Sequence, residues 1–174
     1  MKTVPLHGKK AAGRVAFIDD EDHALISAYR WHVEERRCPN GRVAGPYAST
    51  KVRQDGREVR IGMHALITGF PMTDHRDGNG LNNQRSNLRP ASKAQNNYNQ
   101  RPQAGTSSAY KGVSWHKRDS KWQAEIKVGG MRRFLGYFTS EEEAANAYAN
   151  AAMEIQGDYA YAARAVSPSA DGAT

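Results

Sequence analysis

The chain has 174 residues, which is enough for one ordinary domain or for two or three very small ones. It carries 25 Lys and Arg residues against 18 Asp and Glu, and no stretch approaches the roughly 18 uncharged apolar residues that a membrane helix needs. Its one cysteine, Cys38, excludes an internal disulfide and a cysteine-rich zinc site, so we expect an intracellular protein with nucleic acid as its first partner class.

Residues 1–62 are expected to form a small β-rich support region. The acidic run at residues 19–22 predicts a helix N-terminus, because carboxylates there accept free backbone N–H groups; a metal site is the alternative interpretation. Short apolar or alternating runs predict the strands, and turn residues separate them. The strands are expected at residues 14–18, 31–33, 47–53 and 57–61, with turns at residues 39–41 and 55–56.

Residues 63–100 have the most unusual amino-acid composition in the chain. Seven asparagines lie between residues 79 and 99, but ordered features are interleaved with them, which argues against a simple low-complexity tract. Ser92 and Gln95 have the capping-box spacing that opens a helix. The expected order is strand, loop, strand and helix, closing near residue 100.

The segment that follows contains Pro, Gly and Ser, so residues 101–108 are expected to be a flexible linker. Beyond it, the apolar and polar alternation of residues 122–127 predicts a half-buried strand. Gly129 and Gly130 predict a hairpin turn to a second strand over residues 132–138.

A helix is expected after these strands. Ser140 and Glu143 have capping-box spacing, and Gly157 is a suitable C-terminal stop. Residues 109–162 are therefore predicted to form a three-stranded antiparallel sheet covered by one helix. A disordered tail is expected over residues 163–174.

The predicted sheet and helix carry opposite charge. Residues 107–139 hold seven basic and two acidic residues, whereas residues 140–174 hold one basic and six acidic residues. Trp122, Ala124 and Ile126 are expected to face the helix, which leaves the alternate positions of this strand on the open face. A basic sheet face can enter the major groove of DNA; accidental charge patchiness on a solvated surface is the alternative.

This last segment resembles the plant APETALA/ethylene-response-factor type of DNA-binding domain. The matching residues are Tyr110-Lys111-Gly112-Val113, residues 122–126, 134–138 and 142–148, Ala151-Ala152 and Gly157. The resemblance implies that three strands enter the major groove while the helix packs behind them. The DNA contacts that it implies are Lys111, Ser114, His116, Gln123, Glu125, Lys127, Arg132 and Phe134. Because Ser114 and His116 stand where arginines are usual, the plant target sequence is not implied.

Residues 63–100 resemble the HNH nucleases, in particular the homing type encoded by phages and introns. The matching residues are Asp74-His75, Asp77-Gly78, Asn82-Asn83, Asn87-Leu88-Arg89 and Asn96, with Met63-His64 upstream. The asparagine of the Asn-Leu pair follows the histidine by twelve residues, and the last asparagine follows nine residues later. The resemblance implies two strands and a helix around one divalent metal, the ββα-metal fold.

These residue types permit hydrolysis of a phosphodiester bond. His75 is the expected general base, because an imidazole titrates near neutral pH, and Asn87 or a backbone carbonyl is expected to orient it. In the family the residue at Asn87 usually ties the loop together. Asp74 and Asn96 are oxygen donors of the kind that Mg²⁺ prefers, so we expect one Mg²⁺ or Mn²⁺ ion per site. His64 is expected to be a packing or hydrogen-bonding residue.

The sequence therefore predicts an α+β protein that acts as a metal-dependent HNH endonuclease on double-stranded DNA. With one nuclease centre, a monomer is expected to nick, and a dimer would be needed for a double-strand break. No membrane and no protein partner are expected, and a phage-encoded chain would act in the cytoplasm of its bacterial host. The alternatives are a protein that binds DNA without cutting it, and an RNA-binding or structural protein.

Overall fold

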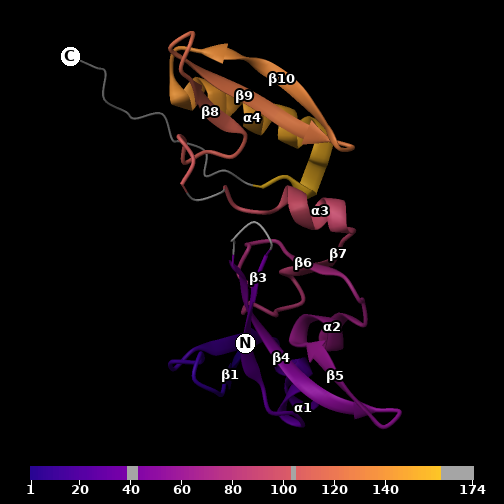
Figure 1. Ribbon diagram of the computed structural model, residues 1–174. Coiled ribbons are helices and arrows are strands. Elements are labelled where there is room, and N and C mark those ends of the chain that lie inside the picture. Colours follow the sequence, from indigo (N-terminus) through magenta and orange to yellow (C-terminus); the bar gives the residue numbers. More distant parts are fainter. Residues whose placement is uncertain (39–42, 103–104, 162–174) are drawn as a thin grey trace, which may run out of the picture. The chain divides into compact units, whose positions relative to one another are not determined.

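The structure is a computed structural model, and it describes residues 1–38, 43–102 and 105–161. The described residues form an α+β arrangement of small antiparallel sheets and few helices (Figure 1). They divide into two compact units, residues 1–96 and residues from 97 onward. The turn expected at residues 39–41 and the tail expected at residues 163–174 lie outside the described residues.

The N-terminal unit contains three small sheets. Strand β1 pairs with β2, β4 pairs with both β3 and β5, and β6 pairs with β7, all antiparallel. The bounds of the strands are β1 Lys2–Pro5, β2 Val15–Ile18, β3 His32–Arg37, β4 Val43–Gln54, β5 Arg57–Gly62, β6 Thr73–His75 and β7 Leu88–Pro90. The helices are η1 Asp20–Asp22, α1 His23–Ser27, α2 Met63–Thr68 and α3 Lys93–Tyr98, of which the last two residues belong to the second unit. These positions confirm the strands expected at residues 14–18, 47–53 and 57–61.

Local turn and cap chemistry also matches the sequence in this unit. Asp55 and Gly56 both have positive φ, 51° and 74°, as the tight turn between β4 and β5 requires. The backbone N–H of Ser92 donates to the Gln95 side chain at 2.8 Å, and the Ser92 hydroxyl accepts from the Gln95 backbone at 3.2 Å. The expected capping box therefore opens α3.

One hydrophobic core joins residues 1–62 to the segment that follows them. Ile18, Trp31, Met63 and Leu88 are all buried in a single cluster, although Leu88 comes from a strand of the expected nuclease segment. Residues 1–62 thus share their hydrophobic core with residues 63–88, and their role as a support region stays a prediction. Burial of shared apolar surface makes residues 1–96 one unit.

The acidic run at residues 19–22 does begin helical structure, since η1 and α1 follow Asp19. Its carboxylates, however, do not cap that structure with their side chains. The Asp19 side chain accepts a hydrogen bond from the Arg85 backbone at 2.8 Å, and Asp22 accepts two from the Arg85 guanidinium, at 2.6 and 3.0 Å. The run therefore fastens a distant loop to the N-terminal segment.

The C-terminal unit is a three-stranded sheet covered by a helix, as expected. The strands are β8 Val113–His116, β9 Lys121–Val128 and β10 Met131–Phe138, in the order β10-β9-β8, and α4 Glu141–Gln156 lies against them, followed by η2 Gly157–Tyr159 (Figure 1). Gly129 and Gly130 form the hairpin turn with φ of 57° and 89°. Both hydrogen bonds of the Ser140–Glu143 capping box are present, and Gly157 ends the helix at φ 54°.

Small side chains let helix α4 approach the sheet closely. Ala124 and Ile126 of β9 are buried, as are Ala144 and Ala152 of the helix. At Gly112 (φ 73°) the fit leaves no space, because an added Cβ would lie 2.2 Å from the Tyr148 ring and 2.5 Å from the Glu125 carbonyl oxygen. The covering helix is therefore held at a fixed depth on the sheet.

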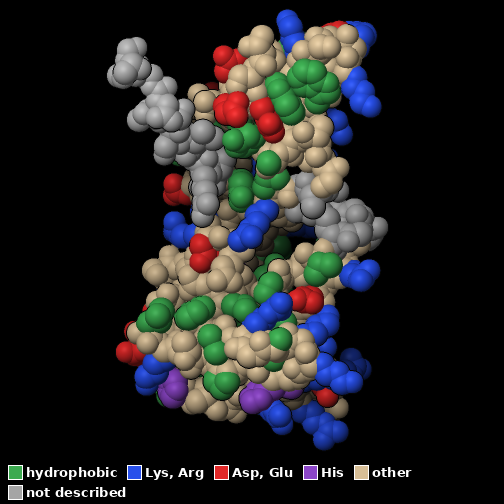
Figure 2. Space-filling view, turned by 90° about the vertical axis from the view of Figure 1, so that its left-hand side faces the viewer, with side chains coloured by type: hydrophobic (Ala, Val, Ile, Leu, Met, Phe, Trp, Pro, Cys, Tyr) green, Lys and Arg blue, Asp and Glu red, His purple; other side chains and the backbone are tan. Residues whose placement is uncertain are grey.

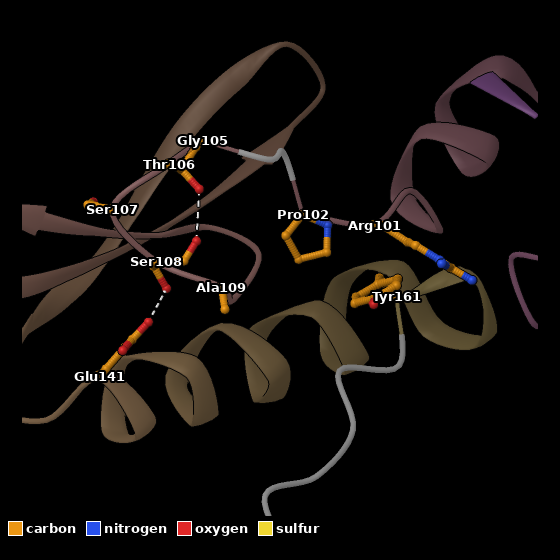
Figure 3. Close-up of a pocket in the computed structure, with 9 residues that line it drawn as sticks. All are labelled: Arg101, Pro102, Gly105, Thr106, Ser107, Ser108, Ala109, Glu141 and Tyr161. Atoms are coloured by element: carbon orange, nitrogen blue, oxygen red, sulfur yellow. Dashed lines mark hydrogen bonds between the residues drawn. The ribbon is translucent and has the colours of Figure 1, made fainter. Parts of the chain in front are cut away.

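The segment expected to be a flexible linker, residues 101–108, is bound to this unit over its second half. The Ser108 hydroxyl donates to Glu141 Oε1 at 2.6 Å, beside an open pocket (Figure 3). Ser108 also accepts from the Tyr110 backbone, and Ser107 accepts from the Trp115 backbone. Residues 105–108 thus belong to the C-terminal unit. No helix among the described residues has the length and apolarity to cross a membrane.

Candidate active site and nucleic-acid-binding face

Strands β6 and β7 frame the candidate active site. In their register Asp74 lies opposite Arg89, and His75 lies opposite Leu88. Adjacent residues on a strand project to opposite faces, so Asp74 and His75 diverge. Their contacts agree with this: Asp74 binds Arg89, whereas His75 contacts Asn83 and the rings of His64 and Tyr47.

The imidazole of His75 lies in a recessed position with 6% of its surface exposed. Its Nε2 is 3.4 Å from Asn83 Oδ1, and Asn83 is itself fully buried and donates to the Leu81 carbonyl. If the amide oxygen accepts, Nε2 carries the hydrogen and Nδ1 is the basic nitrogen. Burial lowers the pKa of His75 below its ordinary value, which favours the neutral, proton-accepting form near pH 7.

Two aromatic side chains, those of His64 and Tyr47, line the side of the site that holds His75. The His64 ring lies 5.3 Å from the His75 ring, edge to face, and Tyr47 lies 6.0 Å from it. His64 Nδ1 is buried and has no hydrogen-bond partner among the residues that the structure describes, and burial lowers the pKa of His64 to about 4. Gly80 admits Tyr47, since a Cβ there would lie 2.4 Å from its ring. His64 is therefore a packing residue, and it packs on the candidate base.

Asn87 ties together the loop between β6 and β7, residues 76–87, which we call the site loop. Its Oδ1 accepts from the Asp77 backbone, and its Nδ2 donates to Asp77 Oδ1 at 3.0 Å and to the Asn82 carbonyl at 2.8 Å. Asp77 Oδ2 in turn accepts from the Asn82 side chain. These contacts give Asn87 the loop-tying role, while Asn83 is the side chain placed to orient His75.

Asp74 forms a buried ion pair. Arg89 donates from Nε at 2.8 Å and from Nη2 at 2.6 Å, both to Asp74 Oδ2, and both side chains are 7% exposed. Removal of either side chain would break this buried pair, which is expected to cost stability. The sequence marks Arg89 only as a motif residue and predicts no role for it.

Asn96, the second expected metal ligand, lies half-buried on α3, directly after the capping box. The oxygens of Asp74 and Asn96 are donors of the class that suits Mg²⁺. Across the residues that the structure describes, no three His, Cys, Asp or Glu side chains gather in a way that could hold a metal ion. The metal ligation expected of Asp74 and Asn96 therefore remains a prediction.

The open face of the C-terminal sheet carries seven of the eight residues expected to contact DNA. Cross-strand register places Ser114 opposite Gln123, Glu125 opposite Phe134, and Lys127 opposite Arg132. Arg132 also reaches diagonally to Glu125 at 3.0 Å. The seven residues that share this face are Ser114, His116, Gln123, Glu125, Lys127, Arg132 and Phe134.

A bulge adds a residue that the sequence analysis missed. The register shifts between Phe134 and Gly136, which brings Tyr137 opposite Gln123 and onto the open face. The Tyr137 ring lies 5.0 Å from Phe134 and 5.1 Å from His116, and Phe134 is 54% exposed. Glycine inside a strand is the signal that could have predicted this bulge.

Lys111, the eighth expected contact, lies elsewhere. Its ammonium donates to the backbone carbonyls of Asn97 and Tyr98, at 3.1 and 2.6 Å, at the C-terminal end of α3. A cation at that position satisfies free carbonyls and suits the helix dipole. The contact of Lys111 with DNA remains a prediction from resemblance, and the structure assigns this side chain a capping role.

The charge separation expected for the C-terminal unit is visible in its surface. In the upper part of Figure 2, Asp and Glu side chains lie mainly to the left, and Lys and Arg side chains lie mainly along the right-hand edge. Helix α4 begins with three consecutive glutamates, whereas the open sheet face carries Lys127 and Arg132. A polyanion would therefore be attracted to one side of this unit.

Comparisons with known proteins find relatives of different kinds. The chain is 28% identical over 151 residues to a protein of Acanthamoeba polyphaga mimivirus described as an uncharacterized HNH endonuclease, covering 87% of this chain and 75% of the viral protein. Over 52 residues it is 46% identical to an AP2-like ethylene-responsive transcription factor of Arabidopsis thaliana, 29% of this chain and 10% of the plant protein. Over 59 residues it is 37% identical to Protein 3.8 of Escherichia phage T7, 34% of this chain and 49% of that protein.

The chain is thus similar over most of its length to a protein described as an HNH endonuclease, and over a shorter stretch to an AP2-like transcription factor. No protein-family model matches the chain. No solved structure matches it significantly either.

Proposed function

We propose that the protein is a metal-dependent HNH endonuclease that hydrolyses phosphodiester bonds in double-stranded DNA. The observation that carries the proposal is the recessed His75 beside Asp74 on paired strands, in a chain similar over most of its length to a protein described as an HNH endonuclease. The strands β6 and β7 followed by α3 have the order of a ββα-metal motif.

In this proposal His75 removes the proton from the water that attacks the phosphorus. Its lowered pKa keeps it neutral at physiological pH, and Asn83 fixes the ring by accepting from Nε2. Asn87 and Asp77 hold the site loop in shape, so that the base keeps its position. General-base catalysis of this kind contributes about 10²- to 10⁴-fold in rate.

Asp74 and Asn96 would hold one Mg²⁺ or Mn²⁺ ion through their oxygens. When bound, the ion neutralises charge on the phosphate and on the leaving 3′-oxygen. The side chains themselves supply no dense anionic cage, so the ion would keep several water ligands. Chelation by EDTA should abolish cleavage and leave DNA binding by the C-terminal unit in place.

The C-terminal unit would direct the nuclease to DNA through the open face of its sheet. A two- or three-stranded sheet fits the major groove, and Lys127 and Arg132 supply positive charge on that face. Phe134 and Tyr137 add exposed aromatic surface between the charged residues. The bulge that exposes Tyr137 thus belongs to the proposed DNA-binding face.

One nuclease centre per chain would nick DNA as a monomer. The similarity to a phage protein supports a phage or mobile-element origin of the homing type, with action in the cytoplasm of a bacterial host. A protein that only binds DNA is the competing function, and it predicts no cleavage at any metal concentration.

The direct test is a plasmid-nicking assay with the full chain in Mg²⁺. We expect conversion of supercoiled to open-circular DNA by the wild type and not by His75→Ala, with DNA affinity little changed because the base acts in the transition state. Cleavage by His75→Ala at the wild-type rate would refute the base assignment. A wild type that binds but never nicks would favour the binding-only function.

A further inference from the structure

A cluster of charged side chains extends from the candidate active site across the sheet β3-β4-β5. In the register of that sheet Glu34 lies opposite Tyr47, and Arg60 lies opposite Lys51. Every second residue of a strand projects to the same face, so these four side chains share one face of the sheet. The Tyr47 ring lies 6.0 Å from the ring of His75. This face of the sheet therefore adjoins the candidate base.

Glu34 holds two arginines on this face, Arg36 and Arg60, which we call the arginine pair. Glu34 Oε1 accepts from Arg36 Nε at 2.7 Å and lies 3.3 Å from Arg60 Nη1. The Glu34 side chain is 10% exposed, whereas the two arginine side chains are 71% and 51% exposed. One nearly buried negative charge thus underlies two exposed positive charges.

The carboxylate of Glu34 is ionised near neutral pH. Burial acts to raise its pKa, but hydrogen bonds from Arg36, Ser49 and Arg60 hold the pKa of Glu34 below its ordinary value. Because the same oxygen meets both guanidiniums, these groups lie close together. Their positions are therefore set by the fold and not by chance contacts in solvent.

The positive charge of the arginine pair reaches the candidate site. After burial and the neighbouring His75, the charge of Arg36 is the next cause that lowers the pKa of His64. His64 packs on His75 and also lies against the sheet, since a Cβ added at Gly62 would lie 2.7 Å from the His64 ring. An anion bound by the pair would therefore lie beside the imidazoles of the site.

The chemistry of the pair suits phosphate groups. A guanidinium has five N–H donors in a planar fork that matches the oxygens of a phosphate, and one carboxylate oxygen cannot use all the donors of two guanidiniums. Two exposed like charges held close together also repel, and an anion between them offsets this repulsion. DNA is the polyanion that the proposed function brings to His75, so its phosphates are the groups that would meet the pair.

We propose that Arg36 and Arg60 form a phosphate clamp, in which Glu34 positions the two guanidiniums on DNA phosphates beside the bond presented to His75. The inference rests on the proposed function, because it concerns how the same site holds its substrate. The clamp belongs to the N-terminal unit and is distinct from the open sheet face of residues 113–138. Contacts to phosphates carry no sequence information, so the clamp would hold any duplex at the cutting site and leave target choice to other groups.

The test measures duplex binding by the full chain in EDTA, by fluorescence anisotropy of a labelled duplex over a salt series. Its background is the chain with Lys127→Glu and Arg132→Glu, in which binding through the open sheet face is weakened. In that background Arg36→Gln and Arg60→Gln should each weaken binding roughly threefold to tenfold and reduce the slope of log affinity against log salt by about one. In the otherwise unchanged chain, each should raise the KM for plasmid nicking several-fold with kcat little changed.

Arg57→Gln is the matched control. Arg57 is exposed and lies opposite Gln54, on the other face of the same β4–β5 hairpin, so its loss removes an equal charge and should change neither affinity nor salt slope. Each clamp variant leaves Glu34 one arginine, so the unfolding midpoint should stay near that of the wild type. Arg36→Lys and Arg60→Lys keep the charge and should retain most of the salt slope.

Effects of the two arginine variants no larger than that of Arg57→Gln, in both binding and KM, would overturn the inference. Plasmid nicking separates this failure from failure of the proposed function. A wild type that nicks, together with arginine variants that nick at the wild-type KM, would remove the clamp and keep the nuclease. A chain that never nicks but loses duplex binding in Arg36→Gln and Arg60→Gln would keep the phosphate-binding pair and remove the nuclease.

Discussion

The two units of this protein present their functional side chains in opposite ways. In the N-terminal unit His75, Asp74 and Asn87 are each less than 9% exposed, and several elements converge to hold them. In the C-terminal unit Lys127, Arg132 and Phe134 stand on an exposed sheet face whose support is a separate layer of small residues. The difference indicates that the candidate catalytic groups are held inside the fold, whereas the groups that would contact DNA lie on its surface.

This contrast predicts how each unit responds to change. A substitution in the candidate active site should alter activity and stability together, because the same hydrogen bonds serve both. A substitution on the open sheet face should alter DNA binding alone. Disruption of the C-terminal unit should require a change in the layer beneath that face.

The largest effect on stability is expected at Gly112, beneath the C-terminal sheet. Gly112→Ala places a Cβ within 2.5 Å of both the Tyr148 ring and the Glu125 carbonyl oxygen, in a positive-φ conformation. We expect a loss of about 3 kcal/mol or more. Gly129→Ala is the matched control, because its φ is also positive but nothing lies within 4 Å; it should cost about 1 kcal/mol. Urea denaturation followed by tryptophan fluorescence compares them, and equal losses would contradict the packing argument.

A somewhat smaller effect is expected from the pH dependence of the N-terminal unit. The pKa of His64 is lowered to about 4 by burial, so the unfolded chain binds the proton more readily than the folded chain. Because burial disfavours the protonated ring, the folded state keeps its full stability above pH 6.5 and loses stability as pH falls from 6.5 toward 4. The loss from His64 should be roughly 2–3 kcal/mol, and burial of His75 acts in the same direction.

His64→Phe tests this assignment, because Nδ1 would lose no hydrogen bond to any residue in the described part of the chain. The variant should show a shallower fall in stability over the same pH range than the wild type. His32→Gln, at an exposed position, should retain the wild-type slope. Identical slopes for His64→Phe and the wild type would show that another group causes the acid sensitivity.

The site loop offers a test of comparable size. Asn87→Ala removes three hydrogen bonds around Asp77 and leaves a carboxylate oxygen without one of its donors, which should cost about 2 kcal/mol and slow cleavage. Asn79→Ala removes one part-buried hydrogen bond, from the Leu81 backbone, and should cost less than half as much. A variant Asn87→Ala with wild-type stability would mean that the loop is held mainly by its contacts with Asp19 and Asp22.

The smallest effect on the fold, but a clear effect on binding, is expected on the open sheet face. Lys127→Glu and Arg132→Glu should each weaken DNA binding by roughly tenfold and reduce its salt dependence, while the unfolding midpoint changes little. Glu154→Lys changes charge on the exposed side of helix α4 and should not weaken binding. Fluorescence anisotropy over a salt series measures this, and equal losses for sheet and helix variants would mean that the sheet is not the DNA-binding face.

Local patterns in the sequence were sufficient for much of the fold. Capping boxes at Ser92 and Ser140 and the glycine turn at residues 129–130 depend on neighbours within four residues, and the structure confirms each. The covering helix and the buried side of β9 follow from simple periodicity. These features are independent of what the rest of the chain does.

Pairings between residues far apart in the chain could not be predicted from the sequence. Arg85 and Asp22 are 63 residues apart, and Arg89 meets Asp74 only because β6 and β7 adopt one particular register. The bulge that exposes Tyr137 and the use of Lys111 to cap α3 likewise depend on how packed elements meet. The missed features at the candidate site, Asn83 and the role of Arg89, are of this kind.

The central claim is that catalysis belongs to the N-terminal unit and DNA contact to the C-terminal unit of the same chain. Measuring plasmid nicking and duplex affinity in parallel for His75→Ala and for Lys127→Glu combined with Arg132→Glu tests it most directly. The account predicts that His75→Ala binds normally and does not nick, and that the double variant binds weakly but nicks at nearly the wild-type rate when protein is in excess. If either variant loses both activities in proportion while remaining folded, the division of labour is contradicted.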